Sequence, residues 1–342
     1  MLDKLPIPSL RVQRLIAFLV ILTQGGISVT GAIVRVTASG LGCPTWPQCF
    51  PGSFVPVPHA EVPVVHQAVE FTNRMFTFGV VLTAALAVLA VIRAGRRREV
   101  QVYAWLMPAS TVVQAIIGGI TVRTGLLWWT VAVHLLVSMV MVWLAVLLYV
   151  KIGEPDAGTD RLVVPQPLRW FTVLTAVTLS TVLITGTLVT GAGPHAGDKS
   201  ALQPVKRLQV EITDLAHLHS SLLVAYLSFV IGLGFALLAV RAPKPVLLRL
   251  AVLAGLVLAQ GAVGAVQFYT GVPAVLVAIH VAESGLRYPS QVASRDAATP
   301  KSVPEFSQGG DMPPQIDVRD LGSDCRPLPT LPGVSVSEFS AP

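Results

Sequence analysis

The sequence predicts an all-α polytopic membrane protein built from two similar four-helix bundles in tandem. Of its 342 residues, 53% are hydrophobic and only 12% are charged, whereas a soluble domain carries about 25% charged residues. Several apolar runs match the roughly 20 residues that a helix needs to cross a bilayer. An internal repeat indicates two copies of one bundle. These observations exclude an ordinary soluble enzyme.

Seven complete spans are expected, followed by an eighth that is incomplete. The eighth begins near Pro273 and offers about ten apolar residues before Glu283, where roughly 20 are needed to cross the membrane. The complete spans are expected at residues 15–34, 71–92, 102–122, 127–150, 168–190, 217–240 and 246–268.

The distribution of Lys and Arg predicts the orientation of these spans. Thirteen cations lie in the N-terminal segment and in alternate loops, against six at the opposite ends. Because cytoplasmic loops carry an excess of Lys and Arg, we expect a cell-membrane protein with a cytoplasmic N-terminus. The formal net charge of +6 then belongs to loops, and no nucleic-acid partner is expected. The first apolar run is too long for a cleaved signal peptide, so we expect it to be a true span.

A set of residues recurs with a constant offset of 146, which identifies the two halves as residues 1–150 and 151–282. Because each half holds an even number of spans in this pattern, both share one orientation in the membrane. The residues Gln114, Gly118, Thr124, Gly125, Ala132 and His134 return as Gln260, Gly264, Thr270, Gly271, Ala278 and His280, and a weaker echo pairs Thr30-Gly31 with Thr185-Gly186.

Five histidines lie in or at the ends of the expected spans, where polar side chains are costly and commonly mark a site. Any one of them could instead be a structural residue with a hydrogen-bond partner. Each half, however, offers histidine on its second and fourth helices, and two imidazoles across a four-helix bundle suit the axial positions of heme iron. Zinc would need further N or S ligands, and none is evident. The five are His66, His134, His217, His219 and His280.

The repeat separates His219 from His217. The two are about 200° apart around a helix, so only one of them can face a given heme. Shifting His219 back by the repeat offset gives Asn73, in the second helix of the first half. We therefore expect His219 to be the internal ligand and His217 to lie near the surface.

Glu70 is the carboxylate that we place within a span. It shares one helical face with His66, Asn73 and Arg74, because residues three and four apart are neighbours on a helix. One interpretation is a local ion pair with Arg74, since buried acids are rarely unpaired. The other is a carboxylate held beside a substrate for proton transfer.

The first outer loop and its flanks carry a specific pattern that resembles the heme A synthases. The pattern is joined by the paired histidines and by a Glu-x-x-Asn-Arg motif at residues 70–74, and it extends over about residues 12–282. The resemblance implies eight helices in two similar halves and oxidation of a ring methyl of heme O to a formyl group, giving heme A for terminal oxidases. The quoted segments are Thr30-Gly31-Ala32-Ile33-Val34-Arg35 and Ser39-Gly40-Leu41-Gly42-Cys43-Pro44-Thr45-Trp46-Pro47-Gln48-Cys49.

The resemblance also implies roles for individual residues. Glu70 corresponds to the catalytic glutamate and His134 to the histidine that holds the substrate, heme O. His219 and His280 would be the axial ligands of a cofactor heme b. The implied chemistry is successive hydroxylation of one methyl followed by loss of water, in which the heme supplies the redox chemistry and the protein orients it.

The outer side of the membrane carries the remaining predicted site residues. By the same resemblance, Cys43 and Cys49 match an external cysteine pair, on the side where disulfides persist. A free or metal-bound pair is the alternative. Arg35, Arg74 and Arg123 could pair with heme propionates, or could simply be interfacial cations.

The chain departs from the family pattern at two places. Asn73 stands where the family has a histidine, and a neutral amide is a poor iron ligand, so either His66 replaces it or the substrate heme hangs from His134 alone. The incomplete eighth helix leaves His280 on a stub, where unsatisfied backbone groups are costly. Residues 283–342 are rich in Pro and Ser without apolar periodicity, and we expect a disordered or frame-shifted tail there.

The implied partners are heme O and the lipid bilayer, with heme O synthase and terminal oxidase assembly as further candidates and a homo-oligomer left open. Three alternative functions remain at this point. A membrane diheme b-type electron carrier explains the histidines equally well. An inactive, truncated synthase copy would share the same pattern. A transporter built from repeats would bind no heme.

Overall fold

The computed structural model describes residues 6–156, 165–198 and 205–286, which form eight helices. Within these ranges the β pairing is limited to two isolated bridges, Ser39 with Asp198 and Phe50 with Ser53. The prediction of an all-α fold is confirmed. The helices are α1 (Leu10–Val36), α2 (Val64–Arg93), α3 (Arg98–Arg123), α4 (Trp128–Gly153), α5 (Gln166–Ala192), α6 (Ile212–Ala239), α7 (Lys244–Tyr269) and α8 (Ala274–Leu286).

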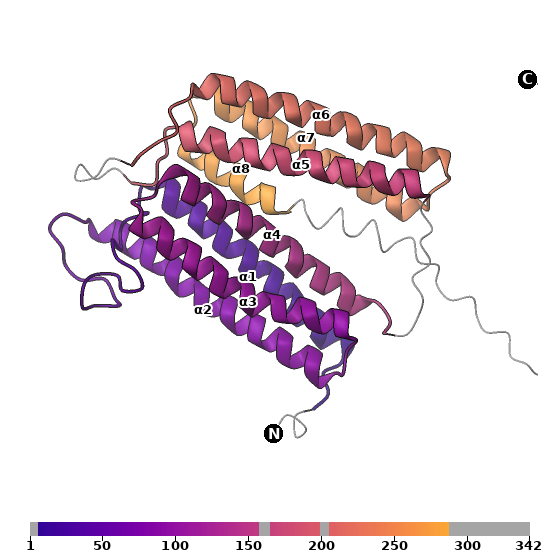
Figure 1. Cartoon of the computed structure of the whole chain (residues 1–342), viewed down its shortest axis with the longest axis horizontal. Helices are drawn as coiled ribbons and strands as arrows, with labels where there is room; N and C mark the ends of the chain where they lie inside the picture. The colour runs from indigo at the N-terminus through magenta and orange to yellow at the C-terminus, as the bar shows by residue number, and fades with distance from the viewer. Residues whose placement is uncertain (1–5, 157–164, 199–204, 287–342) are drawn as a thin grey trace, which may run out of the picture. The chain divides into compact units, whose positions relative to one another are not determined.

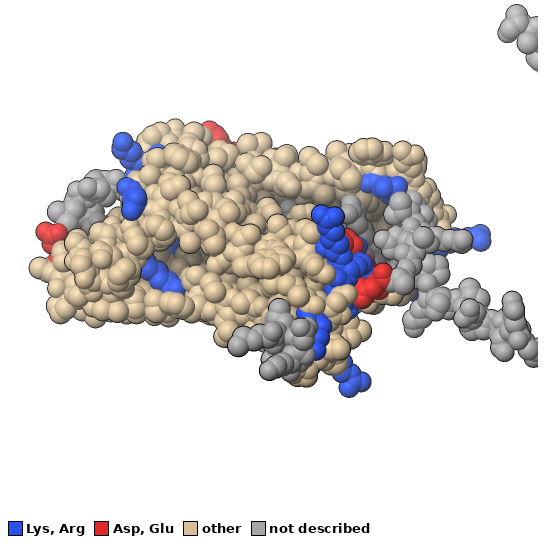
Figure 2. Space-filling model, turned by 60° about the horizontal axis from the view of Figure 1, so that its bottom comes forward, with Lys and Arg blue, Asp and Glu red and all other residues tan. Residues whose placement is uncertain are grey.

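The surface of the helices identifies the solvent in which they fold. Helices α1–α7 are 26 to 30 residues long and apolar enough to cross a membrane. Large apolar side chains are exposed along them, for example Phe235 at 69% and Leu248 at 66%, which water would not tolerate over so wide an area. On the face shown in Figure 2, the charged side chains lie toward the ends and an uncharged zone lies between them. The chain is therefore a multi-pass membrane protein.

Helices α1–α4 form the first bundle (Figure 1). Both α1 and α3 pack against α2 and against α4, so α2 and α4 occupy diagonal corners. The core contains many small residues, with Ala17, Ala84 and Ala145 all fully buried. Small side chains let helix backbones approach closely, and such packing is what holds helices together where lipid is as apolar as the core.

In the second half, α6 packs against α5 and α7, and α7 packs against α8. Its core surrounds Tyr226 and Val257, which are both fully buried. The described α8 has 13 residues, half the length of α7, as the short apolar run predicted. The expected disordered or frame-shifted tail lies, beyond Leu286, outside the described residues.

Hydrogen bonds join the two halves at the end of the helices that carries the loop of residues 37–63, which we call the outer end. The Arg35 guanidinium on α1 donates to the carbonyls of Thr190 and His195, both at 2.9 Å. The imidazole Nε2 of His195 in turn lies 2.9 Å from the carbonyl oxygen of Val272, directly before α8. Elsewhere α1 contacts α8 and α4 contacts α5.

The opposite, inner end of the first bundle carries a network of ion pairs. Arg96 is only 8% exposed and bonds to Asp156 at 3.0 Å. Lys151 reaches both Glu99 at 3.3 Å and Glu154 at 3.1 Å. Burial lowers the pKa of Arg97 next to them, but its hydrogen bond to Glu154 and the Glu154 charge outweigh this, so the net shift is upward.

Helix α2 starts earlier than the apolar run predicts. It begins at Val64, whereas the run begins at residue 71, directly after Glu70. A charge at position 70 ends an apolar run in the sequence. The helix nevertheless continues through it, since glutamate is a good helix former, and the Arg74 guanidinium one turn later lies 2.6 Å from the carboxylate.

Candidate functional site

Four glycines lie at one level near the outer end, one on each odd-numbered helix. Each lies five or six residues before the last residue of its helix. They are Gly31 on α1, Gly118 on α3, Gly186 on α5 and Gly264 on α7, and we call them the tier glycines. The repeat-equivalent polar residues of the even helices, at positions 73, 134, 219 and 280, lie between the seventh and the tenth residue of α2, α4, α6 and α8.

Three of the tier glycines lie directly beneath an imidazole ring. A Cβ atom added to Gly118 would lie 3.4 Å from Cε1 of His134. The corresponding distances are 3.1 Å from Gly186 to His219 and 3.0 Å from Gly264 to His280. Because glycine has no side chain, each ring can rest against the backbone of the neighbouring helix, which fixes its position.

The His219 ring is further oriented by hydrogen-bond contacts of its Nδ1 atom. Its Nδ1 lies 3.0 Å from the carbonyl oxygen of Val182 and 3.2 Å from the hydroxyl of Thr185, both on α5. A proton on Nδ1 that is donated to the carbonyl places the ring's lone pair on Nε2. This arrangement is typical of histidines that bind metal, whose second nitrogen is held by a backbone carbonyl or carboxylate.

A glutamine supports the helix turn that carries histidine in each half. Gln260 donates its amide to the carbonyl of His280 at 2.6 Å, and Gln114 makes the same contact to His134 at 3.4 Å. Gln114 also donates to Ser138 at 2.7 Å. These contacts give a physical reason for the recurrence of glutamine in the repeat.

The fourth tier glycine differs from the other three. A Cβ atom added to Gly31 would meet no other atom within 4 Å. The equivalent polar residue is Asn73, whose carbonyl oxygen accepts a hydrogen bond from Thr30 at 2.6 Å. Thr30 thus contacts Asn73 as Thr185 contacts His219, but the shorter amide does not cover the glycine.

Glu70 lies one turn of α2 from Asn73, toward the outer end, and is only 5% exposed. Its Oε1 lies 2.6 Å from the Arg74 guanidinium, and its Oε2 accepts a hydrogen bond from the backbone N–H of Cys43 at 2.7 Å. Both carboxylate oxygens therefore have a donor. The local ion pair with Arg74 is present, which does not exclude a role for the carboxylate beside a substrate.

Arg74 ties the outer loop to α2. Besides Glu70, it donates to the carbonyls of Cys43 at 2.8 Å, Thr45 at 3.1 Å and Gln48 at 3.2 Å. The same loop is closed by a disulfide between Cys43 and Cys49. We call residues 43–49 the disulfide loop. The guanidinium thus holds the loop and the carboxylate in one arrangement.

The disulfide loop also reaches across to α3. A Cβ atom on Gly119 would lie 2.7 Å from the Trp46 ring, so the indole fits only over a glycine. Arg123, at the end of α3, donates to the carbonyl of Trp46 at 3.1 Å and lies 5.9 Å from the centre of its ring. The loop therefore covers the outer ends of α2 and α3.

His66 is held away from the tier. Its Nδ1 lies 2.9 Å from the hydroxyl of Ser39, in the turn that follows α1. It precedes Asn73 by seven residues, which is about 10 Å along a helix. His66 and Asn73 share a face of α2 but not a level. His217 is exposed, and so lies at the surface as expected.

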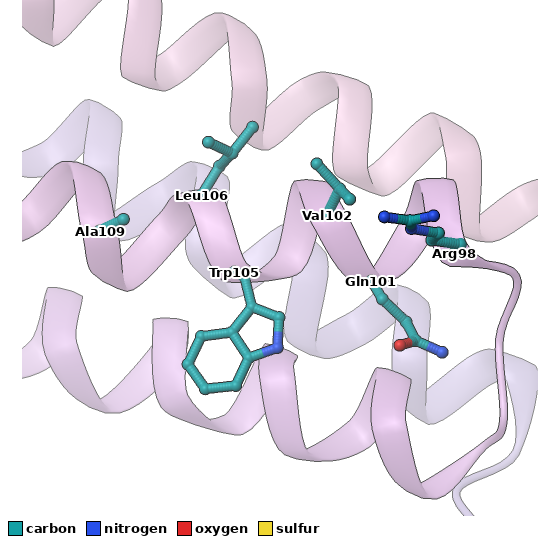
Figure 3. Close-up of a pocket in the computed structure, with 6 residues that line it drawn as sticks. All are labelled: Arg98, Gln101, Val102, Trp105, Leu106 and Ala109. Carbon is teal, nitrogen blue, oxygen red and sulfur yellow. The ribbon is translucent and has the colours of Figure 1, made fainter.

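Other features of the described residues offer no competing site. No group of three or more His, Cys, Asp or Glu side chains in the described ranges could hold a metal ion. A hollow of about 370 Å³ is lined by residues 98–109 of α3, at the inner end of that helix and far along it from Gly118. Figure 3 shows that its side chains all come from α3, among them Trp105 and Arg98.

The sequence reveals most residues of the site but not their contacts. The tier glycines at 118 and 264 and the glutamines stand out as repeats, and the Thr-Gly echo marks the other two glycines. Nothing in the sequence, however, shows that the glycines lie beneath rings. The carbonyl of Val182 and the hydroxyl of Ser39 carry no signal at all, because their contacts join separate helices.

Comparison with known proteins matches most of the chain to one family and parts of it to individual relatives. The family described as cytochrome oxidase assembly protein matches residues 14–286. A heme A synthase of Lysinibacillus sphaericus (strain C3-41) is 33% identical over 165 residues, which are 46% of this chain and 52% of the relative. The heme A synthase of Geobacillus kaustophilus (strain HTA426) is 33% identical over 98 residues, 28% of this chain and 29% of the relative. The chain thus spans about half the length of the first of these relatives.

Proposed function

The chain belongs to the family of the cytochrome oxidase assembly proteins and heme A synthases, and from that membership we propose that it is itself a heme A synthase. The proposed reaction oxidises a ring methyl of heme O to a formyl group, giving heme A for a terminal oxidase. The first half would bind heme O through His134, with Glu70 as the acid–base group. The second half would hold a cofactor heme b between His219 and His280.

The observation that carries this proposal is a difference between the halves. Glu70 and Arg74 lie on α2, where the repeat offset of 146 places Ala216 and Ser220 in the second half. The paired carboxylate therefore occurs in one half, and the complete pair of glycine-backed histidines in the other. An enzyme with one reacting heme and one cofactor heme needs such a division, whereas a carrier of electrons does not.

The histidines fit a heme by their chemistry and surroundings. The Nδ1 of His219 lies 3.0 Å from the Val182 carbonyl, and such a contact is typical of the second nitrogen of a metal-binding histidine. The Nδ1 of His134 is buried without a hydrogen-bond partner among the described residues. Imidazole nitrogens in the interior of a four-helix bundle are ordinary heme ligands. When bound, the hemes would supply the redox chemistry.

The chain's own residues would supply position and proton transfer. Glu70 would take up the proton that is released when the methyl is oxidised, since a carboxylate close to a reacting group acts as a general base. Arg74 would keep that carboxylate oriented through the 2.6 Å contact. The disulfide loop above them would restrict the entry of water, which strengthens the electrostatic interactions beneath it.

The membrane topology completes the proposal. We place the protein in the cell membrane, with the N-terminus in the cytoplasm and the disulfide loop on the outer side. The excess of cations at the inner end of the helices supports this orientation, and a disulfide persists outside the reducing cytoplasm. Heme O synthase and terminal oxidase assembly remain proposed partners, and a homo-oligomer stays open.

The proposal is tested by replacing Glu70 in cells that supply heme O. We expect Glu70→Gln to lower heme A formation by about 10²-fold or more, because it removes the proton acceptor, while the bound heme is retained. The matched control is Glu61→Gln, at an exposed carboxylate of the same outer loop, which should leave heme A formation unchanged. Equal heme A from the Glu70→Gln variant and from the wild type would refute the catalytic role.

A membrane diheme b-type carrier is the second candidate, favoured by the glycine-backed histidines in both halves. It would bind heme and yet form no heme A, whatever residue stands at position 70. An inactive, truncated synthase copy is favoured by the short α8, and predicts loss of heme b from the second half. Extraction of the hemes from the purified protein separates the three functions.

A further inference from the structure

We infer that the first half carries its heme on His134 alone, and that the open space beside Gly31 accepts a small neutral iron ligand in place of a second imidazole. The inference rests on the proposed function, and it concerns the coordination of the heme in that half. It follows from the equivalence of positions 73, 134, 219 and 280, of which position 73 carries an asparagine and the other three carry histidine.

The equivalence of Asn73 and His219 is visible in their contacts. Thr30 bonds to the Asn73 side chain at 2.6 Å, and Thr185 lies 3.2 Å from the His219 ring. Each threonine directly precedes a tier glycine. Asn73 therefore occupies the place in the first half that a ring occupies in the second.

The missing ring leaves space at Gly31. In the second half, a Cβ atom on Gly186 would lie 3.1 Å from the His219 ring, whereas one on Gly31 would meet nothing within 4 Å. The Asn73 side chain is a poor substitute as a ligand, because its neutral carbonyl oxygen is held by the hydrogen bond from Thr30 and its amide nitrogen has no lone pair to donate. No side chain of α2 therefore supplies an iron ligand beside the space at Gly31.

His66 does not fill this position. Its ring is held by Ser39 at 2.9 Å, and its backbone lies about 10 Å from that of Asn73 along α2. The carbonyl of His66 also faces Gly42, where an added Cβ would lie 2.2 Å away, so this end of α2 is fixed against the outer loop. Of the two ligand sets that the sequence left open, the structure favours His134 alone.

The surroundings of Gly31 favour a small and neutral ligand. Asn73 and Thr30 beside it are uncharged, and Glu70 and Arg74 neutralise each other at 2.6 Å. An uncompensated ionic ligand would pay the cost of burial there. Imidazole, the group that Asn73 lacks, is therefore the natural probe.

The test uses the full chain loaded with ferric heme b, with the spin state of the iron as readout. A bis-imidazole iron is low-spin, and an iron with one imidazole and an open or water-filled position is high-spin. We expect one low-spin heme from His219 and His280, and one high-spin heme in the first half. Added imidazole should convert the high-spin heme to low-spin in the wild type, which needs no substitution.

Two variants sharpen the test. Asn73→His should make the first-half heme low-spin without imidazole and lower its apparent affinity for imidazole by about tenfold or more. Adding Gly31→Ala to Asn73→His should reverse part of this change, because the new ring needs the bare glycine. Gly31→Ala alone should leave the high-spin signal in place. His134→Ala should remove the high-spin heme and keep the low-spin one.

The outcomes distinguish this inference from the proposed function. Two low-spin hemes in the wild type, or a high-spin heme that ignores both imidazole and Asn73→His, would overturn the inference and leave the synthase proposal standing. A protein that binds heme in the second half only, at every heme concentration, would overturn both.

Discussion

The two halves of this protein share one architecture but differ in what surrounds the tier glycines. In the second half, both Gly186 and Gly264 lie beneath imidazoles. In the first half, only Gly118 does so. Asn73 stands where an imidazole is missing, and the buried pair of Glu70 and Arg74 lies on the same turns of α2. Under the proposed function, one copy of the duplicated bundle would hold a cofactor and the other would be the reaction site. Glu70, which precedes Asn73 on α2, and Arg74, which follows it, account for most of that difference.

The largest expected effect comes from removing a ligand in the complete half. His219→Ala should abolish the low-spin heme, because a single histidine on the short α8 would remain. The matched control is His217→Ala, two residues away on the same helix and exposed, which should leave the spectrum unchanged. An unchanged low-spin heme in His219→Ala would contradict the assignment of the cofactor site. The absorption spectrum of each purified variant checks it.

The next effect contrasts two equivalent glycines. Gly186→Ala should destabilise the protein by about 1–3 kcal/mol, because the added methyl presses on the His219 ring. Gly31→Ala should be neutral or stabilising by up to about 1 kcal/mol, since alanine is the better helix former and the space is open. Thermal unfolding in detergent would measure both. Equal destabilisation by the two substitutions would mean that Gly31 is not the emptied counterpart of Gly186.

These predictions depend on features that the sequence reveals to different degrees. The spans, the repeat and the short eighth helix could be predicted, because a bilayer penalises polar groups so strongly that apolar length alone decides the outcome. The hydrogen-bond partner of His66 could not be predicted. Helical spacing puts it on the face of Glu70 and Asn73, but its contact with Ser39 joins α2 to the turn after α1. Contacts between helices leave no periodic trace in a sequence.

The disulfide loop offers a smaller effect, confined to the first half. Replacing both Cys43 and Cys49 by serine should lower the stability of the loop by about 2 kcal/mol, because a short closed loop loses its constraint on the unfolded chain. Arg74 would still bond to three carbonyls of the loop. We therefore expect faster proteolysis of residues 43–49 with an unchanged low-spin heme in the second half. Loss of that heme would contradict the independence of the two sites.

The smallest effect is expected at the inner end. Glu99 is 46% exposed in its ion pairs with Lys151 and Arg97, and exposed ion pairs contribute little. Glu99→Gln should change the stability by less than about 1 kcal/mol and should not alter heme content. A large loss of bound heme in this variant would show that the inner end contributes to a site, which the present account does not include.

The most direct test of the central claim is to identify the hemes that the full chain carries. The chain would be produced together with a source of heme O and purified, and its hemes would be extracted and separated. The account predicts heme b together with heme O or heme A, from two halves with different roles. Heme b alone, at two per chain, would contradict the claim and support a diheme electron carrier.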